Sequence, residues 1–370
     1  MISLKKFFLY TFFILLFFSY SSVYALCENS KSCILIDNNS GRILYSKNSN
    51  EKMLIASTTK LMTFLIAYEN GNLDDIYKVG EEVLSMYGTS IYLSKGEDMS
   101  LRDLLYGLIL RSGNDSSVVI AHNVFGDYDK FISKMNERAL ELGMNDTVFY
   151  NPHGLDEDTK NYSTSYDMAL LSKYLHTIPF YLEVSSTKHY ETSTSLKAYD
   201  WYNRNKMISS YRYTVSGKNG YTPLAGKTLV SGAVLGDLSL SSVSLNDNDI
   251  YNTHKSLYEY GFSKYENYLI INKDMFSYKD DYYKGTLYVK NSFYYPVLEE
   301  EKNKISLVLK IIKGIDTNKS SVVGKIYVYL DKDIIHTDDL YLKRGIGTKT
   351  LSFFEKIILF FKNLFVEKNN

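Results

Sequence analysis

The sequence predicts an α+β domain followed by a small all-β domain and a C-terminal amphipathic helix. Strand signals occur at both ends of the segment from Ser32 to about Tyr265, with long helical patterns between them. This arrangement suggests a sheet whose first and last strands meet. The helical period then disappears, and short β-rich runs separated by turns continue to about Leu342. The last residues place apolar side chains at helical spacing beside charged ones.

The composition is that of a folded protein with a sizeable core. The chain has 370 residues, of which 45% are hydrophobic. Its 42 Lys and Arg are balanced by 42 Asp and Glu, which argues against a strongly basic nucleic-acid-binding protein. Four Pro, without Gly- or Ser-rich tracts, exclude a largely disordered or collagen-like chain. We therefore expect folded domains and no nucleic-acid partner.

Residues 1–25 have the pattern of a secretory signal peptide. Lys5 and Lys6 precede a short apolar run, and small residues occupy the −3 and −1 positions of a cleavage site after Ala25. The alternative is a buried or transmembrane helix, but the apolar run is short for a membrane span. We expect an exported protein at the outer face of the cytoplasmic membrane or in the cell wall.

Two cysteines, Cys27 and Cys33, follow the expected cleavage site. Outside the cytosol they can form a disulfide that closes a small loop. Two unpaired cysteines buried as small hydrophobic residues agree equally well with the sequence. The bulky Leu26 argues against a lipid anchor on Cys27.

The first domain opens with a hairpin and a buried helix. Cys33–Asp37 and Arg42–Tyr45 flank Asn38–Gly41, which has the composition of a turn. Ser57–Asn70 is apolar on nearly all sides and ends at Gly71. A helix of this kind is buried in the centre of a domain.

Further helices and strands complete this domain. Ser100 and Asp103 begin one helix with a capping-box-like pattern, and another helix stops before Pro179. From about Val184 strand signals return, including Thr228–Leu235. The expected helices are Leu101–Leu110, Asp115–Val124, Asp127–Leu142 and Tyr166–His176.

The C-terminal part is β-rich and then amphipathic. Short β-rich runs at Thr286–Val289, Ile305–Ile312 and Lys325–Leu330 predict the small all-β domain. The tail is either an amphipathic helix in the membrane interface, which its terminal position favours, or a helix docked on the protein's own core. The expected division is 1–25 signal peptide, 26–272 α+β domain, 273–347 β-rich domain and 348–370 amphipathic helix.

Three short motifs in the first domain carry the chemistry. The first is Ser57-Thr58-Thr59-Lys60, whose Ser and Lys lie on one helical face, one turn apart. A Ser hydroxyl becomes nucleophilic when a neighbouring base takes its proton. A Lys shielded from water has a lowered pKa and can be that base. A single S-x-x-K is weak evidence, but a Lys inside so apolar a helix is unusual.

The other two motifs are compatible with the same site. Ser112-Gly113-Asn114 offers a hydroxyl that can relay a proton and an amide that can hold a carbonyl, although a helix-capping turn has the same residues. Lys218-Asn219-Gly220-Tyr221-Thr222 enters a strand. Its Lys offers a cation for a carboxylate, and its Gly lets a backbone approach closely. An edge strand here could bind an extended peptide by adding it to the sheet.

In this order and spacing, the motifs match the signature of class A β-lactamases and penicillin-binding proteins. The chain resembles the low-molecular-mass penicillin-binding proteins that act as serine-type D-alanyl-D-alanine carboxypeptidases, the S11-type DD-peptidase family. Ile55–Thr63, Arg111–Ser117 and Asn151–Leu155 carry the resemblance, which extends over essentially the whole mature chain. It implies a β-lactamase/DD-peptidase-like domain, in which helices flank an antiparallel sheet and a helical cluster is inserted.

The resemblance also implies roles for individual residues. Ser57 would attack the terminal D-Ala–D-Ala peptide bond, and Lys60 would be the general base. Ser112 would pass the proton to the leaving D-Ala. Asn114 would bind the substrate amide, and Lys218 would bind the terminal carboxylate. The substrate would be a peptidoglycan pentapeptide stem, with β-lactams as inhibitors.

The rest of the third motif completes the expected substrate site, which comprises Asn219, Gly220, Tyr221 and Thr222 beside Asn114 and Lys218. The backbone N–H groups of Ser57 and Tyr221 would form the oxyanion hole. His153 is expected to be a structural turn residue. We expect no metal or organic cofactor, because the six His show no ligand spacing.

One departure from the family leaves alternatives open. The family usually has Thr or Ser where this chain has Asn219, and the loss of that hydroxyl would weaken carboxylate binding. The main alternative is therefore a catalytically weakened peptidoglycan- or penicillin-binding protein. A β-lactamase-like hydrolase is a further alternative, with Glu157 as the nearest candidate for its deacylating base.

Overall fold

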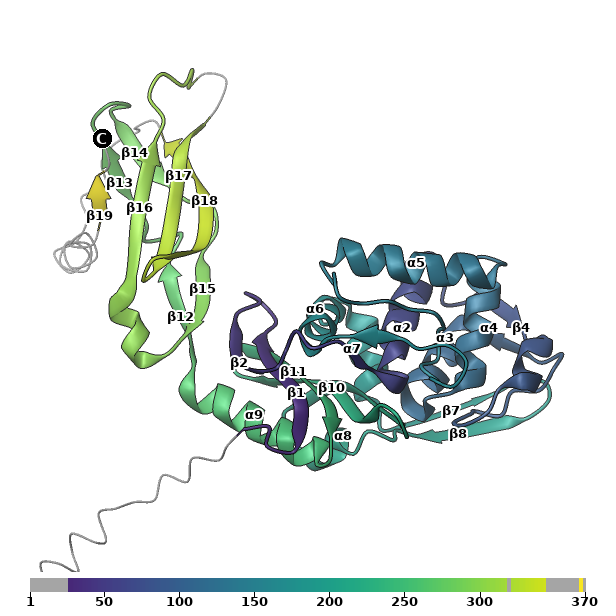
Figure 1. The fold of residues 1–370 in the computed structure, drawn as a ribbon. Coiled ribbons are helices and arrows are strands. Elements are labelled where there is room, and N and C mark those ends of the chain that lie inside the picture. Colours follow the sequence, from purple (N-terminus) through teal and green to yellow (C-terminus); the bar gives the residue numbers. More distant parts are fainter. Residues whose placement is uncertain (1–25, 318–320, 344–365, 369–370) are drawn as a thin grey trace, which may run out of the picture.

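The computed structural model describes residues 26–317, 321–343 and 366–368. The expected signal peptide and almost all of the expected C-terminal helix lie outside these residues. The described residues form an α+β domain and a β-rich domain, joined where helix α9 (Ile250–Lys264) leads into strand β12 (Glu266–Ile271) (Figure 1).

A five-stranded antiparallel sheet forms the centre of the first domain. Its strand order is β2-β1-β11-β10-β9. The strands are β1 (Ser30–Asp37), β2 (Ile43–Lys47), β9 (Thr214–Thr222), β10 (Gly226–Leu235) and β11 (Leu238–Asp247). Strand β1 pairs with β11 from Ser30 opposite Asp247 to Asp37 opposite Leu240. The prediction that the first and last strands of this domain meet is thus confirmed, and β9 lies at the sheet edge.

Helices cover the sheet and form the larger core. They are η1 (Ala56–Thr59), α2 (Lys60–Asn70), η2 (Glu81–Ser85), α3 (Leu101–Tyr106), η3 (Gly107–Arg111), α4 (Asn114–Val124), α5 (Tyr128–Glu141), α6 (Ser165–Leu175), α7 (Pro179–Ser186), α8 (Met207–Ser210) and α9. The short strands between them are β3 (Met53–Leu54), β4 (Ile76–Lys78), β5 (Asp98–Ser100), β6 (Tyr162–Ser163), β7 (His189–Ser193) and β8 (Ala198–Tyr202).

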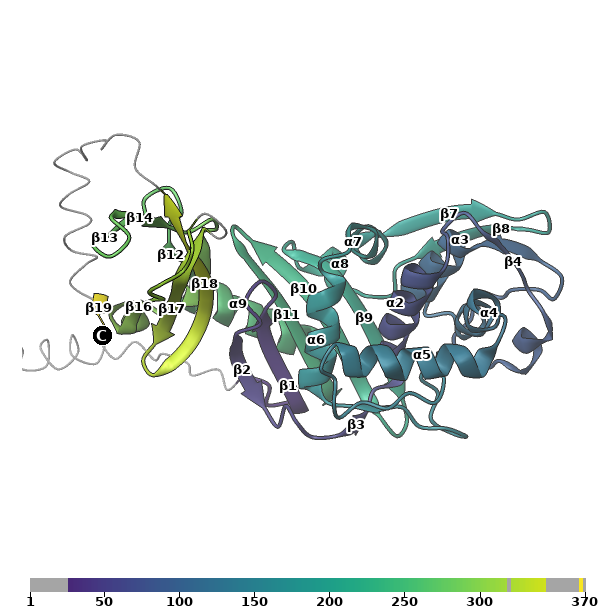
Figure 2. The same ribbon diagram turned by 90° about the horizontal axis from the view of Figure 1, so that it is seen from above.

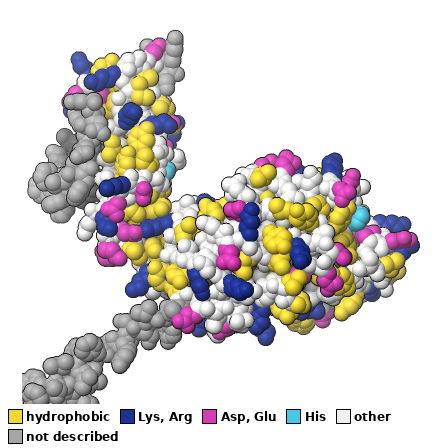
Figure 3. Space-filling view, in the orientation of Figure 1, with side chains coloured by type: hydrophobic (Ala, Val, Ile, Leu, Met, Phe, Trp, Pro, Cys, Tyr) yellow, Lys and Arg dark blue, Asp and Glu magenta, His cyan; other side chains and the backbone are white. Residues whose placement is uncertain are grey.

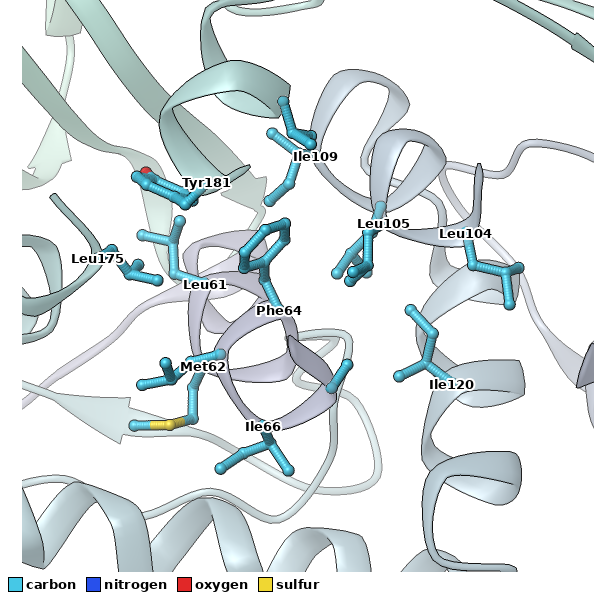
Figure 4. Close-up of a cluster of buried hydrophobic side chains, with 14 of the residues drawn as sticks. Leu61, Met62, Phe64, Ile66, Leu104, Leu105, Ile109, Ile120, Leu175 and Tyr181 are labelled. Carbon is cyan, nitrogen blue, oxygen red and sulfur yellow. The ribbon is translucent and has the colours of Figure 1, made fainter. Parts of the chain in front are cut away.

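Helix α2 is buried in the centre of the domain, as its sequence predicts. Every residue from Lys60 to Ala67 is buried. Figure 4 shows side chains leaving α2 on several sides, with Phe64 toward Leu105 and Ile109. Burying such a side chain contributes about 1.5–3 kcal/mol, so Phe64→Ala would cost about 3–5 kcal/mol including its cavity. This packing fixes the position of the S-x-x-K motif at the start of the helix.

Two helices lie where the sequence suggested a return to strands. Helix α6 ends before Pro179, as predicted, but Pro179 stands in the first turn of a further helix, α7, where a missing N–H has no cost. Helix α9 was not expected because its buried face is formed by residues such as His254, Tyr258 and Gly261 rather than by an aliphatic stripe. The helix covers β10 and β11.

The two cysteines form a disulfide. The Cys27–Cys33 bond joins two residues six positions apart and ties the start of the described chain to β1. Lys47 of β2 donates to the carbonyl oxygens of Cys27 and Ser30, at 2.8 and 2.7 Å. Of the two readings that the sequence left open, the structure has the bonded one.

The β-rich domain begins earlier than the expected boundary at 272/273. Strand β12 already pairs with β15 (Phe293–Val297), so residues from Glu266 belong to this domain. The second sheet has the order β13-β14-β18-β17-β16-β19. Its elements are β13 (Tyr278–Asp280), β14 (Gly285–Tyr288), η4 (Glu299–Lys304), β16 (Ile305–Ile311), β17 (Val322–Leu330), β18 (Asp333–Lys343) and β19 (Val366–Lys368).

Arg42, in the turn between β1 and β2, links the two domains. Its guanidinium donates to the carbonyl oxygen of Pro296 at 2.6 Å and pairs with Glu301 at 2.5 Å. It also lies over the rings of Tyr265 and Tyr295, 5.3 and 5.2 Å from their centroids. In both views the β-rich domain stands at the end of the first domain where β2 and α9 lie (Figure 2).

The surface carries charges of both signs, as the zero net charge predicts. Figure 3 shows basic and acidic side chains interspersed over the visible face of both domains. Within the described residues, no helix has the length and apolar character that crossing a membrane requires.

Candidate active site

The first motif stands at the junction of η1 and α2. Ser57 is a half-exposed residue of η1, and Lys60 is the fully buried first residue of α2. The Nζ atom of Lys60 lies 3.2 Å from the Oγ atom of Ser57. The spacing of three residues thus brings the hydroxyl and the amine into hydrogen-bond distance, as the sequence predicts.

Two further oxygen atoms hold the amine of Lys60. Nζ donates to Oδ1 of Asn114 at 2.7 Å and to the carbonyl oxygen of His153 at 2.5 Å. Burial lowers the pKa of Lys60 well below its usual range, and the positive charge of Lys218 lowers it further, while Asp115 acts in the opposite direction. The buried amine is therefore poised to lose its proton.

The second motif begins where the π-helical turn η3 ends. Ser112 adopts left-handed backbone dihedrals, with φ of 63°, and its side chain is buried. Asn114 is the first residue of α4, and its Nδ2 donates to the carbonyl oxygen of Tyr87 at 2.7 Å. Its amide is therefore fixed between Lys60 and the loop at Tyr87. The carbonyl oxygen of Ser112 accepts from the hydroxyl of Thr89 at 2.7 Å, which ties this turn to the same loop.

The third motif lies on the edge strand β9. Lys218 is buried, and its Nζ donates to the carbonyl oxygen of Asn219 at 2.6 Å. Burial and the nearby Arg204 lower the pKa of Lys218 to about 7. Asn219 is partly buried and Tyr221 is exposed. The buried hydroxyl of Thr222 donates to Asp156.

Gly220 is the point at which the first and third motifs meet. A Cβ atom at this position would lie 2.7 Å from the backbone N of Ser57 and 2.6 Å from Oγ1 of Thr228. Only a residue without a side chain fits there without displacing the neighbours. Strand β9 therefore runs directly beside the nucleophile candidate.

The turn at His153 packs against the start of the first motif and contacts Lys60. Oδ1 of Asn151 accepts from the backbone N of Gly154 at 2.6 Å, and a Cβ at Gly154 would collide with the carbonyl oxygen of Ala56. His153 contacts Lys60 through its carbonyl group, not its ring. Burial and Lys60 lower the pKa of the His153 imidazole to about 3, so the ring is neutral.

Several residues of this neighbourhood were not found from the sequence. They are Tyr87, Asp115 and Arg204. The contact of the His153 carbonyl with Lys60 was not predicted either. Asp115 directly follows the second motif, which is a usable signal. Tyr87 and Arg204 belong to no motif and reach the site only through the folding of distant loops.

One group of side chains in the described residues has the composition of a metal site. His189, Glu191 and Asp200, on β7 and β8, place their ligand atoms within 4.8 Å of one another, and all three are exposed. Nε2 of His189 pairs with Oδ1 of Asp200 at 2.6 Å, which explains their proximity without an ion. None of the three belongs to the motifs above.

Chemically, the assembled site offers a nucleophile, a base of lowered pKa and a cationic end. Ser57 and Lys60 are in hydrogen-bond contact, Asn114 holds the amine, and β9 borders the two side chains at Gly220. Lys218 is the first residue of the motif on β9, and Arg204, from outside this strand, lies close enough for its positive charge to act on Lys218. This combination suits attack on a carbonyl in a peptide that carries a carboxylate.

Comparisons with known proteins agree with this chemistry. A family model described as D-alanyl-D-alanine carboxypeptidase matches residues 21–249, and one for the C-terminal domain of penicillin-binding protein 5 matches residues 265–348. The D-alanyl-D-alanine carboxypeptidase DacF of Bacillus subtilis is 36% identical over 59% of this chain and 57% of its own length. The carboxypeptidase DacC of Escherichia coli is 34% identical over 72% of this chain and 70% of its own length.

A solved structure extends the comparison to the fold. Penicillin-binding protein 5 from Haemophilus influenzae superposes with a TM-score of 0.70 at 23% identity, over 86% of this chain and 98% of its own. The two domains described above are thus a known pairing. The chain belongs to the S11 family of D-alanyl-D-alanine carboxypeptidases, the low-molecular-mass penicillin-binding proteins.

Proposed function

We propose that this protein is a serine carboxypeptidase that removes the terminal D-Ala from peptidoglycan pentapeptide stems through an acyl-enzyme on Ser57. The observation that carries the proposal is the position of the Lys60 amine, buried and held between Ser57, Asn114 and the turn at His153. A hydroxyl beside such an amine is the arrangement that acyl transfer needs.

The hydrogen bonds of Lys60 accommodate a neutral amine as well as a charged one, and burial favours the neutral form. Oδ1 of Asn114 and the carbonyl oxygen of His153 can only accept, so they take the two N–H bonds of a neutral amine. With the amine neutral, the nitrogen lone pair can turn toward the third and longest contact, the Ser57 hydroxyl, to which Nζ donates in the structure. In that state Lys60 is ready to accept the Ser57 proton.

The reaction follows in two halves. Ser57 Oγ attacks the carbonyl carbon of the penultimate D-Ala while its proton passes to Lys60. The resulting oxyanion is stabilised by the backbone N–H groups of Ser57 and Tyr221, beside which Gly220 leaves room. Collapse breaks the C–N bond, and the departing D-Ala takes a proton through Ser112. Water then hydrolyses the ester, and Ser57 is restored.

The cations on and near β9 hold the terminal carboxylate. Lys218 and Arg204 lie close enough for one charge to lower the pKa of the other. A bound carboxylate would relieve that repulsion, so substrate and cations stabilise each other. Asn219 donates through its amide in place of the usual hydroxyl, and Asn114 holds the peptide amide.

Release of D-Ala from a pentapeptide ending in D-Ala–D-Ala tests the proposal. The mature chain should release D-Ala, and its Ser57→Ala variant should not. Absence of release by the unmodified chain would contradict it. Asn219 favours a second candidate function, that of a catalytically weakened penicillin-binding protein. Such a protein would be acylated by penicillin but would not release D-Ala, so the same assay distinguishes it from the carboxypeptidase. A β-lactamase-like hydrolase would instead lose its penicillin adduct within seconds.

We also propose that the protein is exported and held at the membrane by its C-terminal segment. The signal-peptide pattern at 1–25 and the Cys27–Cys33 disulfide support export, because such bonds persist outside the cytosol. The amphipathic pattern of residues 351–365 supports an interfacial helix, which ends before strand β19 (Val366–Lys368). The catalytic domain then ends near α9, and the β-rich domain begins at Glu266.

Truncation tests the anchor. A chain that ends at Gly347 should move from the membrane to the soluble fraction while keeping its penicillin reactivity. A truncated chain that still sediments with membranes would show that residues 348–370 are not the anchor. Replacing Lys356 and Lys362 by Glu is a matched control that keeps the length of the chain and removes its attraction to anionic lipids.

A further inference from the structure

A buried carboxylate directly behind the second motif has no part in the reaction described above. Asp115 is 3% exposed and accepts four hydrogen bonds. Oδ1 accepts from the backbone N of Ile91 at 3.1 Å and from that of Ser116 at 2.9 Å. Oδ2 accepts from the hydroxyl of Ser90 at 2.5 Å and from the backbone N of Leu93 at 3.0 Å.

These bonds attach the segment 87–93 to the residues of the second motif. Within the segment, the carbonyl oxygen of Thr89 accepts from the backbone N of Asn114 at 2.8 Å, and its hydroxyl donates to the carbonyl oxygen of Ser112 at 2.7 Å. The carbonyl of Tyr87 accepts from the Asn114 side chain. The orientation of Asn114, and with it the position of the Lys60 amine, therefore depends on where segment 87–93 lies.

Asp115 also acts on Lys60 through its charge. The charged and titratable groups that face Lys60 are Lys218 from β9, Asp115 from α4 and His153 from the turn after α5. Lys218 lowers the pKa of Lys60, whereas Asp115 raises it. His153 is neutral because of its own burial and of Lys60. The Asp115 carboxylate thus opposes the effects of burial and of Lys218.

We propose that Asp115 is a positioning residue: it holds segment 87–93 against Ser112 and Asn114, and thereby fixes the Asn114 amide that binds the Lys60 amine. This inference rests on the proposed function, because it assigns Asp115 to the reaction of Ser57. It accounts for a buried carboxylate with four donors in the first turn of α4.

Glu97 provides a matched control at the other end of the same loop. It is fully buried and accepts from the backbone N of Ser94 at 2.9 Å and from the hydroxyls of Thr194 and Tyr199 at 2.6 and 2.8 Å. It thus fixes the loop as Asp115 does, but the charges that shift Lys60 are those of Lys218 and Asp115. Glu97→Gln should therefore loosen the loop without changing the charges that shift the pKa of Lys60.

The test is the acylation rate with benzylpenicillin across pH 4–9 for the mature chain, Asp115→Asn and Glu97→Gln. Acylation requires neutral Lys60, so the rate rises with pH through the pKa of that residue. Removing the Asp115 charge should move this acid limb to lower pH by at least ~0.5 unit. Both variants should lose about tenfold or more of the plateau rate, and Glu97→Gln should keep the position of the limb.

Asp115→Glu keeps the inference testable if Asp115→Asn fails to fold. It retains the charge but displaces the carboxylate by one methylene, so it should keep the acid limb and lower the plateau rate. An unshifted limb in Asp115→Asn, an equal shift in Glu97→Gln, or an undiminished plateau in Asp115→Glu would overturn the inference. If the unmodified chain is not acylated at any pH, the proposed function fails instead.

Discussion

The Nζ atom of Lys60 lies 3.2 Å from the Oγ atom of Ser57, across a single helical turn. The proposed base and the proposed nucleophile are thus held within hydrogen-bond distance by the helix itself. The position of the amine also depends on groups far away in the sequence, since Asn114 and the carbonyl of His153 hold the amine from two other segments. The reactive pair is local, but its support is not.

Asn219→Thr should raise kcat/KM for a D-Ala–D-Ala peptide. A Thr hydroxyl on β9 can donate to the substrate carboxylate with a smaller side chain, and one charge-assisted hydrogen bond contributes about 1.5–3 kcal/mol. The expected gain is therefore about tenfold or more. D-Ala release measured against substrate concentration checks it. Asn219→Ala is the matched control and should not gain, while a Thr variant no faster than the unmodified chain would contradict the role given to this position.

Gly220→Ala should impair acylation severely. The added Cβ would lie 2.7 Å from the backbone N of Ser57, so either β9 or η1 must move. We expect the rate of penicillin acylation to fall about a hundredfold, because oxyanion donors act only at short range. Stopped-flow acylation measures it. Gly236→Ala is the control, since nothing lies within 4 Å of its Cβ position, although its positive φ costs some stability. An acylation rate unchanged in Gly220→Ala would refute the close contact.

The activity should decline as the pH rises through about 7. Burial and Arg204 lower the pKa of Lys218 to about 7, so this Lys is charged below that pH and neutral above it. A neutral Lys218 binds the substrate carboxylate weakly, and an alkaline limb in kcat/KM is the expected result. The activity falls as the pH rises because deprotonation of Lys218 removes the positive charge that binds the carboxylate.

Arg204→Gln separates the two contributions to that limb. Removing the neighbouring positive charge raises the pKa of Lys218, so the limb should move to higher pH while KM increases from the loss of the guanidinium. Arg204→Lys should restore the original position. A limb that moves to lower pH, or does not move, would mean that Arg204 does not face Lys218 in solution.

Much of the fold was predictable because its signals are local. The turn residues of Asn38–Gly41, the apolar helix behind Ser57 and the strands at both ends of the first domain each appear in a short stretch of sequence. Together they predict that β1 meets β11. The helix before Pro179 ends as predicted, but α7 was missed because Pro is compatible with both the end of one helix and the start of the next. Helix α9 packs through a buried His and Tyr, which periodicity does not count as apolar.

The site residues likewise fall into those that local sequence motifs predict and those that only the complete fold brings together. The reactive pair follows from the spacing of Ser57 and Lys60, and the motif on β9 follows from its Lys and Gly. By contrast, Arg204 and Tyr87 come from loops whose approach depends on the whole fold. The contribution of His153 is a backbone carbonyl, which no side-chain pattern can reveal. Asn219 was seen in the sequence, and its effect on rate still requires the Thr variant.

The most direct test of the central claim is the intact mass of the mature chain and its Ser57→Ala variant after brief incubation with benzylpenicillin, followed over an hour. The account predicts one covalent adduct on the unmodified chain, located by digestion to the peptide that contains Ser57, and none on the variant. No adduct on the unmodified chain at any time, or an adduct that persists in Ser57→Ala, would contradict it.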